Sequence, residues 1–315
     1  MFKVYVDGQE GTTGLQINER LTKHSNVEIL KIDPEKRKDP AERQKNLNLA
    51  DVAFLCLPDD ASKEAARMTT NPNTRLIDAS TAFRTDPNWV YGLPEMDNQQ
   101  RSLIKNAKRL SNPGCYPTGF VLLIRPLIEK GIIDSDYPVT CHAISGYSGG
   151  GKKLIASYEA QGVSQSHLMA RPYAFGLKHK HAPEMKIHGK LDSAPLFAPS
   201  VGNYYNGMLV MVPLLPRLCK PKNVTPERVV ELYNEHYCGE RFVKVMSPND
   251  ESKLDGGFLD PQGVNGTNLN EIFVFGHDEQ IMLVSRLDNL GKGASGAAVQ
   301  NMNIMLGFDE STGLE

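Results

Sequence analysis

Residues 3–14 of the chain read KVYVDGQEGTTG, and this stretch decides the fold that the sequence predicts. Lys3 to Val6 predicts a strand, and the apolar residues after Gly14 follow helical spacing. A glycine turn between a strand and a helix lets the backbone approach a pyrophosphate at the helix N-terminus. The spacing is GxxGxxG rather than GxGxxG, so an ordinary glycine-rich turn remains the alternative. The expected dinucleotide contacts are Gly8, Gly11, Thr12, Thr13 and Gly14.

Strands and helices alternate as far as residue 112. Further strands are predicted over 27–32, 51–57 and 75–79, with a helix from Pro58 to about Thr69. This alternation predicts a doubly wound, Rossmann-like α/β domain, whose ligands bind outside the carboxyl ends of the strands. At these ends we expect cofactor contacts from Pro58, Ser80 and Thr81. Arg84 is predicted to clamp the cofactor or an anionic substrate, with a surface ion pair as the alternative.

The loop after the second strand bears on the choice between NAD and NADP. Asp33 is placed to take the ribose 2′-hydroxyl of NAD, whereas Lys36, Arg37 and Lys38 suit the 2′-phosphate of NADP. The basic cluster favours NADP, with Arg37 as the contact. A solvated charged loop would have the same composition.

Residues 111–119 read SNPGCYPTG and present one cysteine on a tight turn. Pro117 and the apolar run 120–124 predict a helix that begins near Cys115, continues to Lys130 and is kinked or divided at Pro126. The positive end of a helix favours the thiolate and lowers the pKa of the thiol. Cys115 is therefore predicted to be a nucleophile, against the alternative of a small buried side chain in a loop.

The second half mixes helices with a largely antiparallel sheet. Strands are predicted over 138–145 and 208–215, a hairpin over 271–287, and a helix from Thr225. Residues 146–153, GYSGGGKK, predict a flexible cationic turn that lacks the GxxxxGK[ST] order of a nucleotide loop. Its N–H groups, with Ser148 and Lys152, are predicted to hold a free phosphate or an acyl phosphate.

Residues 179–184 read HKHAPE. We expect the two histidines to point to opposite faces, so that one of His179 and His181 faces a cleft, and we expect no metal to be bound. Cysteine chemistry needs a group that exchanges protons near neutral pH, which an imidazole does. Ordinary surface histidines are the alternative.

The chain ends with DNLGKGASGAA, residues 288–298, and a helix with small residues on one face. We expect this segment to return to the first domain and to place its glycine-rich start near the nicotinamide or the phosphates. The predicted domains are 1–114 with 288–315 for the dinucleotide, and 115–287 for catalysis and oligomerisation.

Composition excludes several classes of function. The net charge of −2 gives no footprint for nucleic acid or an anionic membrane. Five cysteines without CxxC spacing argue against disulfides and a structural zinc site and fit a reducing compartment. With no signal-peptide pattern and no apolar run near ~20 residues, we expect a cytoplasmic protein with a small-molecule partner.

The assembled motifs resemble the N-acetyl-γ-glutamyl-phosphate reductase family, in its shorter type. Residues 7–17, 112–118, 179–184 and 288–294 carry the resemblance. It implies NADPH-dependent reduction of an acyl phosphate to N-acetylglutamate semialdehyde in arginine biosynthesis. The implied fold is similar to those of aspartate-semialdehyde and glyceraldehyde-phosphate dehydrogenases, and the implied assembly is a homodimer or homotetramer.

The resemblance also implies residue roles. Cys115 would carry a thioester, one of His179 and His181 would exchange the proton, and Glu184 would position an imidazole or meet the acetamido group. Arg84 and the turn from Ser148 to Lys152 would be candidates for the phosphate. Asn289 and the following glycines, Gly291 first, would lie against the cofactor. Residues 195–207 lack the arginine that longer members carry nearby, which leaves the substrate carboxylate without a partner. Rival interpretations are the same chemistry on aspartyl phosphate, a non-catalytic NADP-binding sensor, and a cysteine hydrolase.

Overall fold

The computed structural model describes residues 1–160, 164–222 and 224–314. The chain divides into two compact units: residues 1–114 with 294–315 form unit 1, and residues 115–293 form unit 2. The return to the first unit falls at Ala294 rather than at the predicted residue 288. The Asp288 carboxylate accepts hydrogen bonds from Asn206 Nδ2 at 2.9 Å and from the Gly266 N–H at 2.8 Å, which hold it in unit 2.

Unit 1 is built on a parallel sheet whose strand order is β2-β1-β3-β4-β6-β5. The order reverses beside β1, which is where doubly wound sheets bind ligands. The predicted fold class is confirmed. The strands are β1 Phe2–Asp7, β2 Val27–Ile29, β3 Val52–Leu55, β4 Arg75–Asp78, β5 Val90–Tyr91 and β6 Arg109–Ser111.

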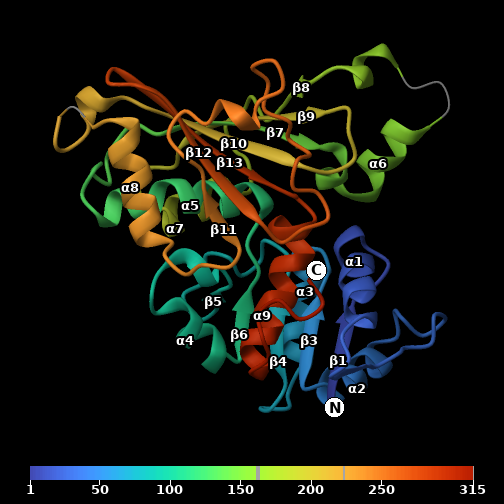
Figure 1. Cartoon of the computed structure of the whole chain (residues 1–315). Helices are drawn as coiled ribbons and strands as arrows, with labels where there is room; N and C mark the ends of the chain where they lie inside the picture. Colours follow the sequence, from blue (N-terminus) through green and yellow to red (C-terminus); the bar gives the residue numbers. More distant parts are fainter. Residues whose placement is uncertain (161–163, 223, 315) are drawn as a thin grey trace. The chain divides into compact units, whose positions relative to one another are not determined.

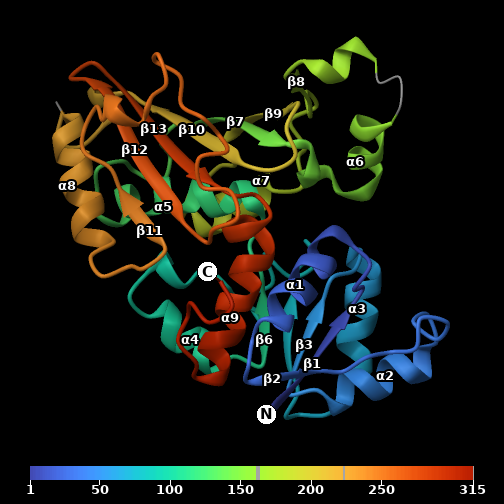
Figure 2. The same ribbon diagram turned by 45° about the vertical axis from the view of Figure 1, so that its right-hand side comes forward.

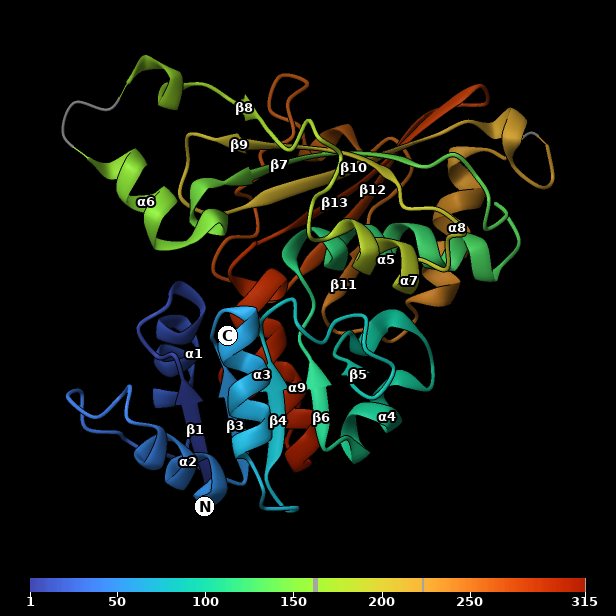
Figure 3. The same ribbon diagram turned by 180° about the vertical axis from the view of Figure 1, so that it is seen from behind.

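Helices cover both faces of this sheet, as the opposite views of Figures 1 and 3 show for α9 and α3. Helices α1 Thr12–Thr22 and α4 Gln100–Asn106 pack against α9 Gly296–Leu306, and α2 Pro40–Leu49 packs against α3 Asp59–Met68. The sequence analysis missed α2, which has little apolar periodicity. Its start is nevertheless encoded: Asp39 accepts from the N–H groups of Ala41 and Glu42, and Pro40 occupies the first turn.

Unit 2 is built on a sheet of order β11-β12-β13-β10-β7-β9-β8, antiparallel except at β11–β12 and β7–β9. Helices α5 Cys115–Glu129, α7 Ala182–His188 and α8 Pro226–His236 lie on one side of it (Figure 2). The strands are β7 Thr140–Gly146, β8 Arg171–Pro172, β9 Leu196–Gly202, β10 Met208–Leu214, β11 Val243–Val245, β12 Asn270–His277 and β13 Gln280–Leu287.

Several predicted elements of unit 2 are confirmed, among them the β12–β13 hairpin and the Thr225 cap of α8, whose hydroxyl accepts from the Arg228 N–H. Helix α5 continues through Pro126 without division. The other helical segments of the chain are α6 Gly151–Glu159, the 3₁₀ turns Pro94–Met96, Tyr147–Gly150, Gln165–Leu168, Pro216–Leu218 and Glu251–Lys253, and a π-helical turn Gly291–Ser295.

Close packing identifies the sheet face that α5 covers. A Cβ on Gly119 of α5 would lie 2.7 Å from Ser285 Oγ and 3.0 Å from Val210 Cγ2. Because side chains alternate along a strand, residues 208, 210, 212 and 214 of β10 face α5, and 209, 211 and 213 face away. The face toward α5 is called the helix face below, and the other is called the open face.

Candidate active site

The glycine turn of unit 1 is held by close backbone contacts. Gly8 has φ +85°, and a Cβ there would lie 2.3 Å from the Cys56 carbonyl oxygen. The Gly11 N–H donates to the Gly8 carbonyl at 3.0 Å, immediately before α1 begins. A Cβ on Gly14 would lie 2.5 Å from the same carbonyl oxygen. The turn therefore tolerates only glycine at Gly8 and brings the start of α1 against the end of β1.

A pocket of 370 Å³ opens beside this turn. Of the predicted cofactor contacts, Gly8, Gly11, Arg37 and Pro58 line it, whereas Thr12, Thr13, Gly14, Ser80 and Thr81 are not among its lining residues. The full lining is Tyr5, Val6, Asp7, Gly8, Gln9, Glu10, Gly11, Ile32, Arg37, Lys38, Arg43, Cys56, Leu57, Pro58 and Ala61. Apolar walls with a cationic rim fit a dinucleotide that carries phosphate.

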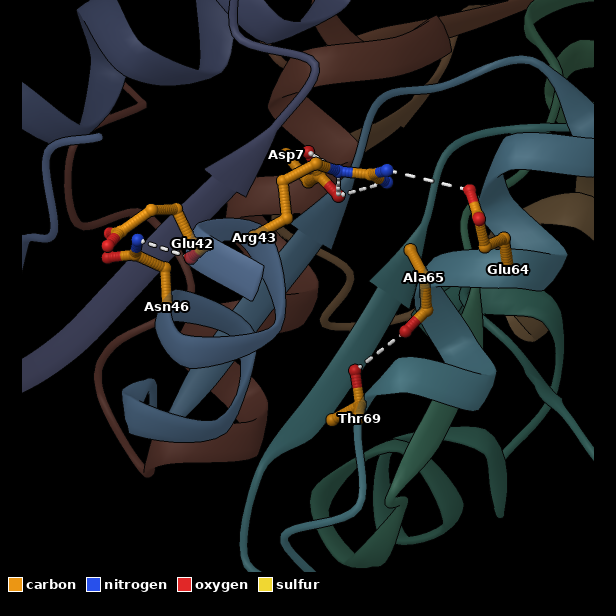
Figure 4. A network of polar contacts seen from close by, with 7 residues as sticks. All are labelled: Asp7, Glu42, Arg43, Asn46, Glu64, Ala65 and Thr69. Atoms are coloured by element: carbon orange, nitrogen blue, oxygen red, sulfur yellow. Dashed lines mark hydrogen bonds and ion pairs between the residues drawn. The ribbon is translucent and has the colours of Figure 1, made fainter. Parts of the chain in front are cut away.

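Arg43 is a lining residue that the sequence analysis missed. Its guanidinium, on α2, binds the Asp7 carboxylate at the end of β1 with nitrogen–oxygen distances of 2.9–3.3 Å. Nη1 lies 3.5 Å from a Glu64 carboxylate oxygen on α3 (Figure 4). Arg43 and Asp7 are both buried, so the pair ties β1 to α2 at the pocket. The Asp39-Pro40 helix start was the signal that could have placed Arg43 on a helix.

Arg37, by contrast, lies at the exposed rim of the pocket. Its Nε is 3.4 Å from a Glu10 carboxylate oxygen, and its Nη1 donates to the Pro34 carbonyl at 2.9 Å. Both partners of the ion pair are more than a third exposed, so it is readily exchanged for a stronger anion.

Arg84, the predicted phosphate clamp, is buried in unit 1. Its Nε donates to the Asn112 carbonyl at 2.9 Å, and Nη2 donates to the Ala79 carbonyl at 3.0 Å. These bonds connect the loop after β4 with the loop after β6. Ser80 Oγ donates to the Asp78 carboxylate at 2.7 Å, and burial raises the pKa of Asp78 to about 6. Thr81 donates to Asp59 through N–H and hydroxyl. The observed contacts of these residues organise the carboxyl edge of the sheet.

In unit 2, Cys115 is the first residue of α5, is half-buried and forms no disulfide. A Cβ on Gly293 would lie 2.8 Å from Cys115 Cβ, so only glycine lets the 288–293 segment come this close. Burial raises the pKa of the adjacent Tyr116 hydroxyl, and the nearby Tyr173 and Cys115 raise it further. The Tyr116 hydroxyl therefore stays protonated at neutral pH.

Two histidines gather with aromatic side chains beside Tyr116. The rings of His179 and His181 are 4.9 Å apart between centroids, and the Tyr116 ring lies 6.0 Å and 5.8 Å from them. Phe197 of β9 lies 5.0 Å from His179. The expectation that the two histidines point to opposite faces is therefore wrong. Residues two apart share a face even on an extended segment, and here residues 179–181 form a turn into α7 that brings the two rings together.

The hydrogen bonds of His179 fix its tautomer. Nδ1 accepts from the His181 backbone N–H at 3.2 Å, so the proton of the neutral ring is on Nε2, which lies 3.4 Å from the Tyr173 hydroxyl. Tyr173 in turn donates to the Tyr116 hydroxyl at 3.3 Å. Burial, with the positive charge of Lys180, lowers the pKa of His179 to about 4. His179 is consequently a neutral hydrogen-bond donor at neutral pH, whereas buried His181 immediately precedes α7 and its buried Glu184.

The glycine-rich segment after β7 is helical rather than a flexible turn, which corrects the prediction. The N–H groups of Gly146, Tyr147 and Ser148 donate to the carbonyls of Gly207, Tyr204 and Tyr205, at 2.9–3.0 Å, so they do not point to an anion. The Asn289 amide donates to Ser148 Oγ at 3.0 Å and accepts from the Gly207 N–H at 2.8 Å. Lys152 is exposed on α6, and Asn289 and Gly291 belong to unit 2.

The structure describes 310 residues, and they were searched for metal-binding clusters and membrane-spanning helices. Within them, no group of three or more histidine, cysteine, aspartate or glutamate side chains could hold a metal ion. Nor, among the same residues, is any helix both long and apolar enough to cross a bilayer.

The doubly wound sheet with its glycine turn and pocket defines a class, the dehydrogenases that bind a nicotinamide dinucleotide. Comparison with known families agrees: "Semialdehyde dehydrogenase, NAD binding domain" matches residues 3–104, and "Semialdehyde dehydrogenase, dimerisation domain" matches residues 115–289. The aspartate semialdehyde dehydrogenase of Francisella tularensis has the same fold, with a TM-score of 0.72 and 15% identity over 97% of this chain and 100% of that one.

Relatives at higher identity give the particular family. The N-acetyl-gamma-glutamyl-phosphate reductase 2 of Nostoc sp. is 50% identical over 99% of this chain and 99% of its own length. The N-acetyl-gamma-glutamyl-phosphate reductase of Allorhizobium ampelinum is 50% identical over 96% of this chain and 98% of its own. The chain belongs to the N-acetyl-γ-glutamyl-phosphate reductase family, as the sequence motifs predict, and is an oxidoreductase.

Proposed function

We propose that this enzyme reduces N-acetyl-γ-glutamyl phosphate to N-acetylglutamate 5-semialdehyde through a thioester on Cys115. The observation that carries the proposal is the position of Cys115 at the start of α5, beside Tyr116 and the two packed histidines. A helix N-terminus stabilises a thiolate, and adjacent imidazoles supply proton exchange.

The Cys115 thiolate attacks the γ-carbonyl carbon, a C–S bond forms, and the C–O bond to phosphate breaks as inorganic phosphate leaves. When bound, NADPH supplies the hydride that reduces the thioester carbonyl carbon. The resulting oxyanion is protonated to a thiohemiacetal. Return of that proton to a base expels the Cys115 thiolate and releases the aldehyde.

We assign the proton exchange to His181 and a positioning role to His179. A base must offer a lone pair and then hold the proton. His179 Nδ1 already accepts the His181 N–H, and its low pKa keeps the ring neutral. His179 instead donates from Nε2 toward Tyr173, which orders the cluster around Tyr116. Glu184, buried in the first turn of α7, is proposed to orient His181.

For the cofactor, the residues present fit NADP. The glycine turn gives the pyrophosphate close access to the start of α1, and Arg37 with Lys38 puts two cations at the pocket for the 2′-phosphate. Thr12, Thr13, Gly14, Ser80, Thr81, Asn289 and Gly291 remain proposed cofactor contacts from the sequence alone. Arg84, Ser148 and Lys152 likewise remain proposed phosphate contacts.

The active form is proposed to be a homodimer that pairs through the open face of unit 2. An apolar cluster there contains Leu209, Phe273 and Val284, with partly buried Met211 and Phe275 packed against it. Leu209, Phe273 and Val284 are themselves buried, so Met211 and Phe275 are the side chains proposed to meet a second copy, in the unit that matches the dimerisation domain. We propose that the enzyme works in the reducing cytoplasm, since none of its five cysteines, all of them described, forms a disulfide.

The test runs the reaction in reverse. Purified enzyme is mixed with N-acetylglutamate semialdehyde, phosphate and NADP, and NADPH absorbance is followed, with aspartate semialdehyde and NAD in parallel. We expect phosphate-dependent NADPH formation from the acetylated aldehyde, and none from Cys115→Ser although that variant still binds NADPH. Preference for aspartate semialdehyde would change the substrate, and normal turnover by Cys115→Ser would exclude the thioester.

A further inference from the structure

We propose that Arg171 binds the α-carboxylate of the substrate. The inference rests on the proposed function and deepens it, because residues 195–207 offer no cation for this carboxylate. Arg171 is the first residue of β8, the edge strand of the unit 2 sheet, and its side chain is half-buried.

Strand alternation puts Arg171 on the helix face with the histidines. β8 runs antiparallel to β9 with Arg171 opposite Val201, and the Tyr173 N–H continues the pairing by donating to the Pro199 carbonyl at 3.0 Å. Residues two apart on a strand point to the same face, so Arg171 shares a face with Tyr173. The Tyr173 hydroxyl contacts His179 and Tyr116, which identifies that face as the catalytic one.

The neighbouring strands give the same answer independently. Phe197 on β9 packs against His179 and Tyr116, and Val201 lies on the same face four residues further along. Val201 is opposite Ser145 on β7, and the Ser145 side chain is among the groups that influence the pKa of the Tyr116 hydroxyl. Arg171, Val201 and Ser145 thus form one row across three strands, which spans about 10 Å between its outer backbones.

Charge supports the assignment. Within the described ranges, no carboxylate forms an ion pair with Arg171, whereas Arg125 and Arg286 of the same unit pair with Glu129 and Glu271. A half-buried guanidinium without an internal counter-ion is suited to a ligand anion, and its fork geometry matches a carboxylate bidentately. In the substrate, three carbon atoms separate the carboxylate carbon from the reacting carbonyl carbon. The carboxylate therefore stays on the face of the sheet where Cys115 lies.

The experiment compares two aldehydes that differ only in the carboxylate: N-acetylglutamate semialdehyde and 4-acetamidobutanal. Both are assayed in the phosphate-dependent reverse direction with wild-type enzyme, Arg171→Met, Arg171→Lys and, as a surface-arginine control, Arg228→Gln. We expect Arg171→Met to lower kcat/KM for the carboxylate substrate 10- to 100-fold, mostly through KM, with 4-acetamidobutanal nearly unaffected. Arg171→Lys should recover part of the loss.

The outcomes separate this inference from the proposed function. Equal losses on both aldehydes would show that Arg171 acts only through the structure of β8 and would overturn the inference. Unchanged kinetics in Arg171→Met would also overturn it, with the reaction itself intact. No turnover of N-acetylglutamate semialdehyde by the wild type would instead refute the proposed function.

Discussion

At the scale of single residues, the two histidines differ in what their ring atoms already do. His179 has a pKa lowered to about 4, against 6.5 in an unfolded chain, so between these values the unfolded state binds more protons. Stability from this group is therefore complete above pH 6.5 and declines as the pH falls toward 4. We predict that His179→Asn, whose amide can replace both hydrogen bonds, lessens the decline in melting temperature between pH 6.5 and pH 5.

The same variant tests the assignment of the base. His179→Asn should retain much of the turnover at pH 7, whereas His181→Asn should lose it by ~10²-fold or more. If turnover instead depends on His179 and survives in His181→Asn, the two roles are reversed.

Arg37 is a second residue whose contacts predict a measurable preference. Its exposed pairing with Glu10 contributes little by itself, since surface ion pairs are worth ~0–1 kcal/mol, so a 2′-phosphate can replace Glu10 as its partner. Arg37→Ala should therefore raise the Kd of NADPH about tenfold or more and leave that of NADH within a factor of two, as measured by fluorescence titration. Equal losses for the two cofactors would remove Arg37 from 2′-phosphate recognition.

At the scale of elements, the glycine turn makes the strongest demand on sequence. Gly8→Ala combines a φ of +85° with a Cβ placed 2.3 Å from the Cys56 carbonyl, so the β1–α1 connection must shift. We predict lowered stability to urea and NADPH affinity weakened at least tenfold. Gly131→Ala is the matched control, because Gly131 has φ +68° with nothing within 4 Å. It should lose only the ~1–2 kcal/mol of a left-handed alanine and bind NADPH normally.

Strong local patterns explain which elements the sequence predicts. Periodic apolar runs and turn residues identified β1, α1, β10 and the β12–β13 hairpin, and Pro117 marked the first turn of α5. Helix α2 was missed because its buried face includes Arg43 and Asn46, which pair with Asp7 and with the Glu42 carbonyl rather than forming an apolar stripe. A helix stabilised by buried polar contacts is invisible to hydrophobic periodicity.

The candidate site was predictable to a different degree. Residue types and spacing indicated Cys115, the histidine pair and the glycine turn, because their chemistry is local. The contact between the His179 and His181 rings, and the side-chain bonds of Asn289 to Ser148, depend on which distant segments meet. The sequence position of a residue does not determine which side chains it contacts in the fold. Arg171 was equally hidden, since only the register of β8 on β9 puts it opposite Val201.

At the scale of the whole molecule, the open face of unit 2 makes a prediction about assembly. Phe275 stacks on Phe273 with centroids 5.8 Å apart, and Arg286 lies 5.1 Å over the Phe273 ring while paired with Glu271. Half-buried aromatic and methionine side chains on a sheet face are typical of a surface that a second copy covers. Phe275→Asp should therefore convert a dimer to monomers in sedimentation velocity, because it puts an unpaired carboxylate into an apolar contact.

A matched substitution in unit 1 serves as the control. Leu103→Asp adds a carboxylate at a 50% exposed leucine of α4 in unit 1, and it should leave the dimer intact. A Phe275→Asp protein that keeps its dimeric mass would mean that another surface joins the subunits. Reactivity of Cys115 in each chain is a second readout beside the sedimenting mass. Cys115, the two histidines and Arg171 all belong to unit 2, and their contacts lie on its helix face. Folded monomers should therefore still add the Cys115 thiolate to the aldehyde as a thiohemiacetal, measured as suppression of Cys115 alkylation by N-acetylglutamate semialdehyde.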